Sequence, residues 1–215
     1  MAMPPFLNHR SLEMESRSPE ETRRLGVSLS PLLRPGDVLA LGGDLGAGKT
    51  TFVQGLAAGL GIVDRVTSPT FVLMREYTGG RYPLIHIDVY RLDRMQDVVD
   101  LGYDEFLDPS HIVVVEWGDM VAPLLPKEHL GVEMRYGTAE TMREIVLRPR
   151  GQGWEERIPA VRALMEELFS ADRDDPLFKE IGPPSELLPP PGGRPGRPGE
   201  SGQPGAHPGP EREEG

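Results

Sequence analysis

The sequence predicts an α/β fold in which a central parallel sheet is flanked by antiparallel strands and by helices. Residues 38–41 and 112–115 are short aliphatic runs, as in strands that are buried on both faces of a parallel sheet. A glycine-rich segment follows the first run, and apolar residues at helical spacing follow that segment. The order of strand, glycine-rich loop and helix is a recurring unit of α/β domains.

A strand and a helix are predicted before this unit. Residues 11–16 alternate polar and apolar side chains, which indicates an edge strand. Ser18 and Pro19 are typical of a helix N-terminus, because serine caps free amides and proline fits the first turn. This helix is expected to run toward Leu33. Its buried face is expected to hold Leu25, Leu29 and Leu32.

The same patterns predict the elements that follow the unit. Residues 71–77 and 82–88 flank a Thr-Gly-Gly-Arg turn, which is typical of a β-hairpin. A second antiparallel pair is predicted at 130–136 and 143–148, on either side of a short polar turn. Short helical segments are predicted at 98–101, 119–125 and 161–168.

The glycine-rich segment carries the chemistry. It matches the phosphate-binding pattern G-x-x-x-x-G-K-[ST], and a predicted strand and helix surround it as that pattern requires. Glycines let backbone amides turn toward phosphate oxygens, and the helix N-terminus adds positive potential. We therefore predict a P-loop NTPase-like fold that binds a nucleotide with Mg²⁺; the resemblance described below implies that this nucleotide is ATP. The nucleotide-binding residues are predicted to be Asp44, Leu45, Gly46, Ala47, Gly48, Lys49, Thr50 and Thr51.

Two acidic residues end predicted strands near this loop. Asp88 closes the strand at 82–88, and Glu116 closes the aliphatic run at 112–115. Open α/β sheets build their sites at the carboxyl ends of strands. Asp88 and Glu116 are therefore candidate catalytic residues that orient water, and Glu116 is also a candidate metal ligand together with Thr50. His86 is interpreted as a hydrogen-bonded strand residue.

Two further positions leave alternatives open. Residues 66–71 are either a loop stiffened by Pro69 or a switch-like segment in which Thr70 or Ser68 approaches the γ-phosphate. Trp117 is placed to stack on a base, to anchor a partner or to pack against the sheet, the last being the commonest fate of tryptophan.

The chain divides into four segments by composition. Residues 1–10 are expected to form a flexible N-terminus, 11–150 the P-loop domain, 151–170 an amphipathic helix and 171–215 a disordered tail. The last 34 residues hold 10 prolines and 9 glycines. Such a segment has too few apolar side chains to bury a core.

Charge and cysteine content limit the function classes. The net charge of −11 argues against direct binding of nucleic acid phosphates, which requires a basic face. The absence of cysteine suits a reducing compartment. The N-terminus lacks a signal-peptide pattern, and no apolar run reaches membrane-spanning length. We therefore expect a cytoplasmic protein without a membrane partner.

Four motifs together resemble the bacterial TsaE family, formerly YjeE. They are the loop at 43–51, the segment at 67–71, the pattern His86-x-Asp88-x-Tyr90-Arg91 and the pair Glu116-Trp117. The resemblance implies a weak Mg²⁺-dependent ATPase that acts with TsaD and TsaB. It also implies threonylcarbamoylation of N6 of adenosine 37 in tRNAs that read ANN codons. The partners would hold the tRNA, and ATP hydrolysis would reset the complex between turnovers.

Under this hypothesis Lys49 contacts the β- and γ-phosphates, Thr50 the metal, and Thr70 senses the γ-phosphate. Three rival classes remain. A small-molecule kinase shares the P-loop, and an interaction module would use nucleotide only structurally. A GTPase is disfavoured, because its N-K-x-D motif needs an asparagine and Asn8 is the only one in the chain.

Overall fold

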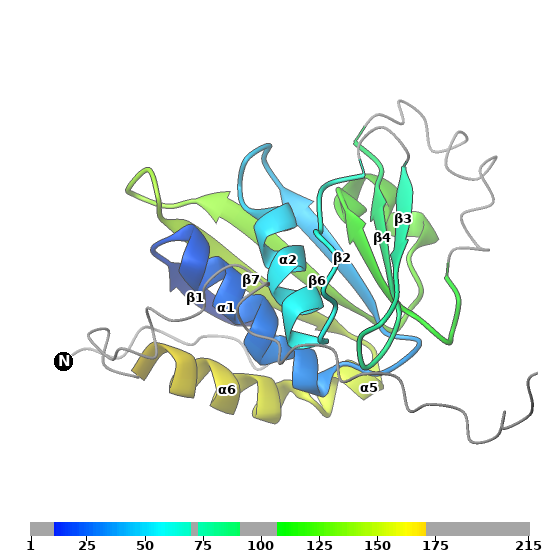
Figure 1. Cartoon of the computed structure of the whole chain (residues 1–215). Helices are drawn as coiled ribbons and strands as arrows, with labels where there is room; N and C mark the ends of the chain where they lie inside the picture. The colour runs from blue at the N-terminus through cyan, green and yellow to red at the C-terminus, as the bar shows by residue number, and fades with distance from the viewer. Residues whose placement is uncertain (1–10, 70–72, 91–106, 171–215) are drawn as a thin grey trace, which may run out of the picture.

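The computed structural model describes residues 11–69, 73–90 and 107–170. Within them, seven strands form one mixed sheet in the order β1-β7-β6-β2-β5-β4-β3 (Figure 1). The strands are β1 (Leu12–Ser16), β2 (Val38–Gly43), β3 (Met74–Tyr77), β4 (Leu84–Asp88), β5 (Ile112–Glu116), β6 (His129–Tyr136) and β7 (Arg143–Arg150). The helices are α1 (Pro19–Leu29), η1 (Ser30–Leu32), α2 (Lys49–Gly59), η2 (Gly118–Leu124), α5 (Gln152–Glu155) and α6 (Ile158–Ser170).

The centre of the sheet is parallel and its two sides are antiparallel. Strand β2 pairs in parallel with β5 and β6, and β5 pairs in parallel with β4. Strands β1, β7 and β6 pair antiparallel on one side, and β3 pairs antiparallel with β4 on the other. The predicted fold class and both hairpins are confirmed. Thr70 and the helix predicted at 98–101 lie outside the described residues.

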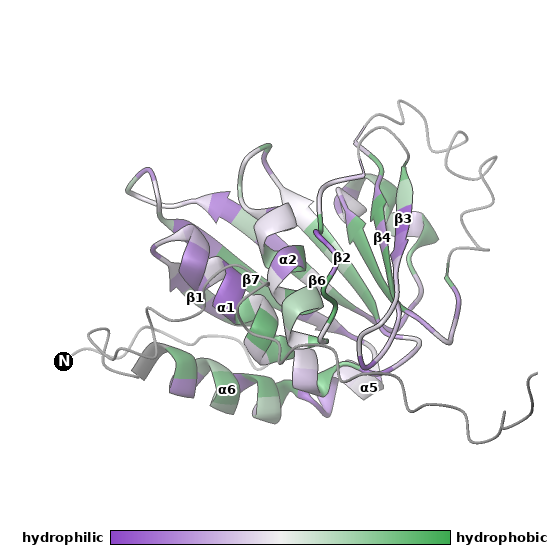
Figure 2. Cartoon of the chain, in the orientation of Figure 1, coloured by the Kyte–Doolittle hydropathy of each residue, from purple (hydrophilic) through white to green (hydrophobic). Residues whose placement is uncertain are grey.

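The sheet separates two apolar clusters. The larger cluster lies between the sheet and the helices α1, α2 and α6, and the smaller lies beside η2 on the other face. Alternation along β5 divides its aliphatic run, since Ile112 and Val114 face the large cluster while Val113 and Val115 face the small one. The same alternation directs Glu116 toward α2. Figure 2 shows the apolar strands in the middle of the fold.

Helices α1 and α2 pack with their backbones in contact. A Cβ atom at Gly55 would lie 1.9 Å from the carbonyl oxygen of Arg23, and one at Gly26 would lie 2.4 Å from that of Phe52. Only glycine permits this approach. The helix that follows the phosphate-binding loop is thereby fixed against its neighbour.

Helix α1 is shorter than the sequence pattern indicated. It was expected to run toward Leu33, but it ends at Leu29 and continues as the 3₁₀ turn Ser30–Leu32. Pro31 explains the end, because proline has no N–H to donate to the preceding turn. Leu25 and Leu29 are buried as expected, whereas Leu32 is only partly buried.

The C-terminal helices share the core of the sheet. Trp154 of α5 and Ile158, Val161 and Met165 of α6 belong to the large apolar cluster. The guanidinium of Arg157 donates to both carboxylate oxygens of Asp37, at 2.6 and 2.8 Å, and covers the ring of Trp154. None of the helices in the described part of the chain is long and apolar enough to cross a membrane.

Candidate nucleotide-binding site

The loop between β2 and α2 has a backbone that only glycine adopts easily. Gly43, Gly46 and Gly48 have φ angles of +112°, +77° and +105°. Gly48 occupies the N-cap position of α2, so the first amides of the helix have no intrahelical acceptor and lie at the end of the loop. This predicted cradle therefore has the shape and the dipole orientation that suit an anion.

Lys49 is folded onto the loop that it follows. Its ammonium donates to the carbonyl oxygens of Gly43 and Asp44, at 2.7 and 2.8 Å. Burial lowers the pKa of Lys49, and the carboxylates of Glu116, Asp119, Asp88 and Asp44 oppose this effect. The ammonium thus uses loop carbonyls as its oxygen partners, in a position from which it can reach phosphate oxygens.

Thr50 and Glu116 meet although they are 66 residues apart. The Thr50 hydroxyl donates to Oε1 of Glu116 at 2.8 Å, and His86 Nε2 lies 2.9 Å from the same oxygen. Helix α2 supplies the threonine, while adjacent parallel strands supply the other two side chains. The two predicted metal ligands therefore lie side by side, and Thr51 follows them in the first turn of α2.

Asp88 also lies at this end of the sheet. It pairs with Glu116 in the register of β4 and β5 and is only 3% exposed. Its carboxylate accepts from the Ser68 hydroxyl at 2.5 Å and from the Tyr90 amide at 3.0 Å. Ser68 thus connects the segment before Thr70 to Asp88.

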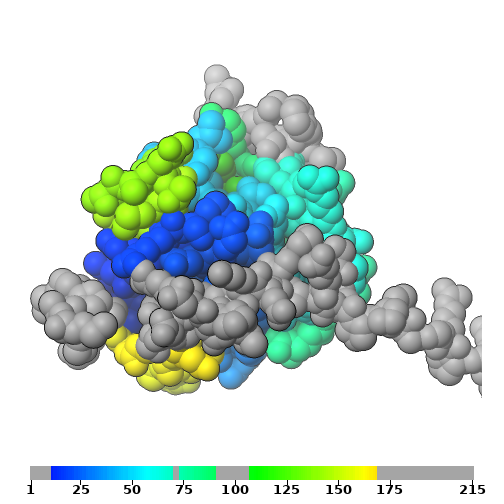
Figure 3. Space-filling model, turned by 60° about the vertical axis from the view of Figure 1, so that its left-hand side comes forward, coloured from blue at the N-terminus to red at the C-terminus, as the bar shows by residue number. Residues whose placement is uncertain are grey.

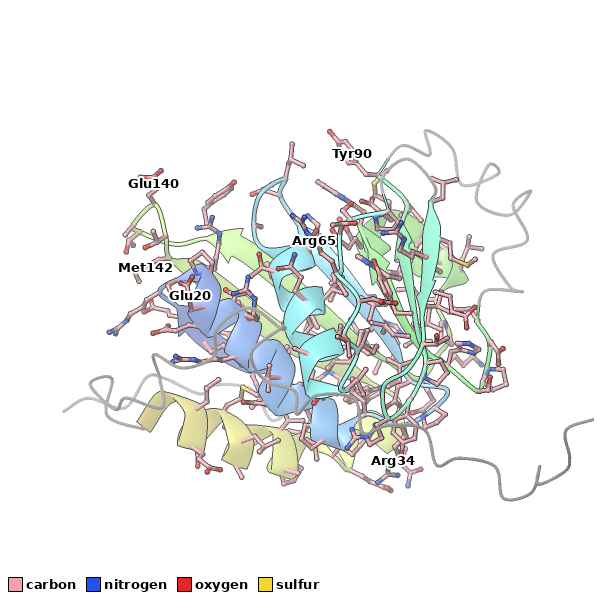
Figure 4. The ribbon with its side chains drawn as sticks, viewed as in Figure 1. Glu20, Arg34, Arg65, Tyr90, Glu140 and Met142 are labelled. Carbon is pink, nitrogen blue, oxygen red and sulfur yellow. The ribbon has the colours of Figure 1, made fainter. Side chains whose placement is uncertain are left out.

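Trp117 contacts Lys49 as well as the small apolar cluster beside the sheet. It has a left-handed backbone with φ of +62°, uncommon for a non-glycine residue. The Lys49 ammonium lies 3.7 Å from its ring centroid, and the Tyr90 ring lies 4.7 Å away on a tilted plane. Tyr90 projects from the same end of the molecule as the β6–β7 turn with Glu140 and Met142, whereas Arg34 marks the opposite end (Figure 4).

Sequence reasoning did not identify two residues that hold the loop from the other side. The Tyr136 hydroxyl donates to the carbonyl of Leu45 at 2.8 Å, and Arg143 donates to the carbonyl of Gly46 at 3.2 Å. The Arg143 guanidinium also covers the Tyr136 ring at 4.4 Å. Figure 3 shows the β6–β7 turn beside this part of the molecule. No local motif marks these residues, because both contacts span more than 90 positions.

A cavity of about 340 Å³ opens at the start of the loop. Its lining is Gly42, Gly43, Asp44, Asp119, Glu133, Arg135 and Tyr136. Burial favours a raised pKa for Glu133, but hydrogen bonds from Arg135 and Arg148 outweigh it and lower that pKa. The lining of the cavity is therefore polar and includes both acidic and basic side chains.

The residues present fit magnesium bound together with phosphates. Within the described ranges, no group of three or more His, Asp or Glu side chains is placed to hold a metal ion alone. Magnesium in phosphate-transfer sites takes one or two protein oxygens and completes its shell with phosphates and water. The hydroxyl of Thr50 and the carboxylate of Glu116 supply such oxygens at the edge of the glycine cradle.

Comparison with known proteins agrees with this geometry. The sequence model of the family described as "Threonylcarbamoyl adenosine biosynthesis protein TsaE" matches residues 16–145. The chain belongs to the TsaE family. Curated proteins named tRNA threonylcarbamoyladenosine biosynthesis protein TsaE are similar to it. That of Bacillus subtilis is 40% identical over 146 residues, covering 68% of this chain and 90% of the relative.

Further relatives extend this similarity. The Treponema pallidum TsaE is 45% identical over 132 residues, which cover 61% of this chain and 96% of the relative. The crystal structure of Bacillus subtilis YdiB superposes with a TM-score of 0.59 at 36% identity, covering 75% of this chain and 95% of that one. Membership of the TsaE family confirms the resemblance that the four motifs indicated.

Proposed function

We propose that this chain is the ATP-binding and ATP-hydrolysing accessory subunit of tRNA threonylcarbamoyladenosine biosynthesis. In this role it acts with TsaD and TsaB homologues in the cytoplasm, and their product is N6-threonylcarbamoyl adenosine 37 in tRNAs that read ANN codons. The relatives named above carry the biosynthetic role in their names. The net charge of −11 supports a subunit that leaves tRNA binding to its partners.

One observation supports the ATPase role above the others. The hydroxyl that follows the loop lysine contacts the carboxylate that ends the neighbouring parallel strand, with Thr50 Oγ1 and Glu116 Oε1 2.8 Å apart. P-loop NTPases hold Mg²⁺ between a loop Ser or Thr and an acid at such a strand end. A purely structural nucleotide site would not need this pair.

The residues divide the work of hydrolysis among them. Lys49 binds phosphate oxygens in place of the carbonyls of Gly43 and Asp44. Thr50 and Glu116 would hold Mg²⁺, which when bound neutralises charge on the phosphates. Asp88 and Glu116 orient a water molecule, which attacks the γ-phosphorus as ADP leaves, so that ADP and inorganic phosphate are the products.

Replacement of Lys49 and Glu116 tests these roles. We expect Lys49→Ala to weaken ATP binding about 10- to 150-fold, since a charge-assisted hydrogen bond contributes about 1.5–3 kcal/mol. Glu116→Ala should bind ATP and fail to hydrolyse it. Isothermal calorimetry and phosphate release measure the two effects, and wild-type binding and turnover by Lys49→Ala would refute the assignment.

A reconstituted reaction tests the biosynthetic role. The chain is combined with TsaD and TsaB homologues, tRNA and a threonylcarbamoyl donor, and modified adenosine is counted by mass spectrometry. Modification over many turnovers should require this chain and its Lys49. The same mixtures with γ-labelled ATP test the rival small-molecule kinase, since label would then move to a metabolite instead of appearing as inorganic phosphate.

A further inference from the structure

His86 is a fully buried polar side chain whose contacts are unequal. It lies in the middle of β4, with none of its surface exposed, and faces α2. Its Nε2 lies 2.9 Å from Oε1 of Glu116, whereas Nδ1 has no partner among the described residues. The ring therefore makes one side-chain hydrogen bond, and that bond ends on a candidate catalytic residue.

The unpaired nitrogen of this ring opposes folding. A buried ring nitrogen without a partner is a cost to stability, and an aliphatic side chain of similar volume avoids it. The neighbouring positions of the same strand show what the core accepts, since Leu84, Ile85 and Ile87 are all buried aliphatics. The hydrogen bond to Glu116 is the feature that an aliphatic residue at position 86 would lack.

The two donors to Glu116 converge on one oxygen. His86 Nε2 and the Thr50 hydroxyl both contact Oε1, and no described side chain donates to Oε2. Oε2 is thus the oxygen of Glu116 that no described side chain occupies. In the proposed function the oxygen of the Thr50 hydroxyl also binds Mg²⁺, so the surroundings of its contact with Glu116 change when nucleotide binds. His86 is not assigned to Mg²⁺, so its hydrogen bond to Glu116 has no second role.

We infer that His86 is a positioning residue, which holds the Glu116 carboxylate in its working orientation through Oε1 when Thr50 serves the nucleotide-bound metal. The inference rests on the proposed ATPase function. It assigns His86 no contact with substrate and no proton transfer. It accounts for an imidazole in an apolar strand, which the sequence alone indicated only as a hydrogen-bonded strand residue.

Three variants of the full chain test the inference. His86→Leu fills the same space without a donor. His86→Gln places an amide N–H near the position of Nε2. His129→Leu is the matched control, because His129 also makes a partly buried hydrogen bond, from Nδ1 to the Pro126 carbonyl at 2.6 Å, but at the opposite end of the sheet.

Loss of an outer-shell partner reduces activity or metal affinity by about 10- to 100-fold. We expect His86→Leu to lower single-turnover ATP hydrolysis by this factor, with unchanged affinity for ATP in EDTA and an unchanged or higher melting temperature. His86→Gln should recover most of the rate. His129→Leu should leave the rate unchanged and lower the melting temperature.

Calorimetry separates this inference from the ATPase proposal. The gain in ATP affinity on adding Mg²⁺ should shrink in His86→Leu and persist in His86→Gln, whether or not turnover is detectable. A wild-type chain that binds Mg·ATP without hydrolysing it would refute the ATPase role and leave this measurement valid. His86→Leu with a wild-type rate of hydrolysis and a wild-type gain in ATP affinity from Mg²⁺ would overturn the positioning role. A loss of rate that is fully explained by a lower melting temperature of the variant would overturn it as well.

Discussion

Replacement of Gly43 by alanine tests how closely the phosphate-binding loop depends on β6. Gly43 ends β2 opposite Met134, with φ of +112°. An added Cβ would lie 1.9 Å from the Met134 carbonyl oxygen. The obstructing atom belongs to the backbone of a central strand, so the two strands must separate by about 1.5 Å to reach ordinary van der Waals contact.

The expected loss has two parts. A left-handed backbone costs a residue with a Cβ about 1–2 kcal/mol, and forcing extra volume into a packed region costs about 1–3 kcal/mol. The free energy of unfolding should therefore fall by about 2–5 kcal/mol. At about 2–4 °C per kcal/mol for a chain of this size, the melting temperature should fall by about 4–20 °C.

Gly79→Ala is the matched control. Gly79 lies in the β3–β4 turn with φ of +88°, and an added Cβ there meets nothing within 4 Å. This variant should lose only the backbone part, about 1–2 kcal/mol. Urea unfolding followed by circular dichroism measures both variants, and calorimetry should show weakened ATP binding for Gly43→Ala alone. Equal losses of stability in the two variants would refute the steric argument.

Three other predictions concern the surroundings of the site. A chain ending at residue 150 should lose about 6–12 kcal/mol of stability, since the four large buried side chains of α5 and α6 contribute about 1.5–3 kcal/mol each. A chain ending at residue 170 keeps these side chains and should unfold in urea like the full chain. Tyr136→Phe removes the hydrogen bond to Leu45 and should weaken ATP binding about 2- to 10-fold by calorimetry; an unchanged affinity would mean that the loop holds its shape alone. Because the pKa of Glu133 is lowered by folding, its ionised form stabilises the protein above the ordinary value of 4.5, and this contribution is lost as the pH falls through the lowered pKa. Glu133→Gln should therefore show a shallower loss of stability in acid, and an unaltered profile would contradict the ion pairs.

Features encoded by neighbouring residues were predictable from the sequence. The loop at 43–51 combines a strand, glycines and a helix within a few residues, so its position and its chemistry follow from local pattern. Alternation and aliphatic composition located β4 and β5, and the carboxyl ends of these strands indicated Asp88 and Glu116. The structure brings both acids to the loop, although their catalytic roles remain predictions.

Features that depend on distant residues were not predictable. Tyr136 and Arg143 hold the loop across more than 90 positions, and the pairing of His86 with Glu116 requires the register of two strands. The contact between Arg157 and Asp37 spans 120 residues and joins a segment that lies beyond the family match at 16–145. Periodicity indicates that such a helix has an apolar face, but not which surface that face covers.

The glycine contact between α1 and α2 decides where the phosphate-binding loop's helix lies. At Gly26 and Gly55 the two backbones lie so close that one added Cβ atom would collide with a carbonyl oxygen of the other helix. The place of Lys49 and Thr50 at the start of α2 is therefore set from behind by α1, and an alanine at Gly26 or Gly55 is expected to shift both side chains without altering the loop sequence.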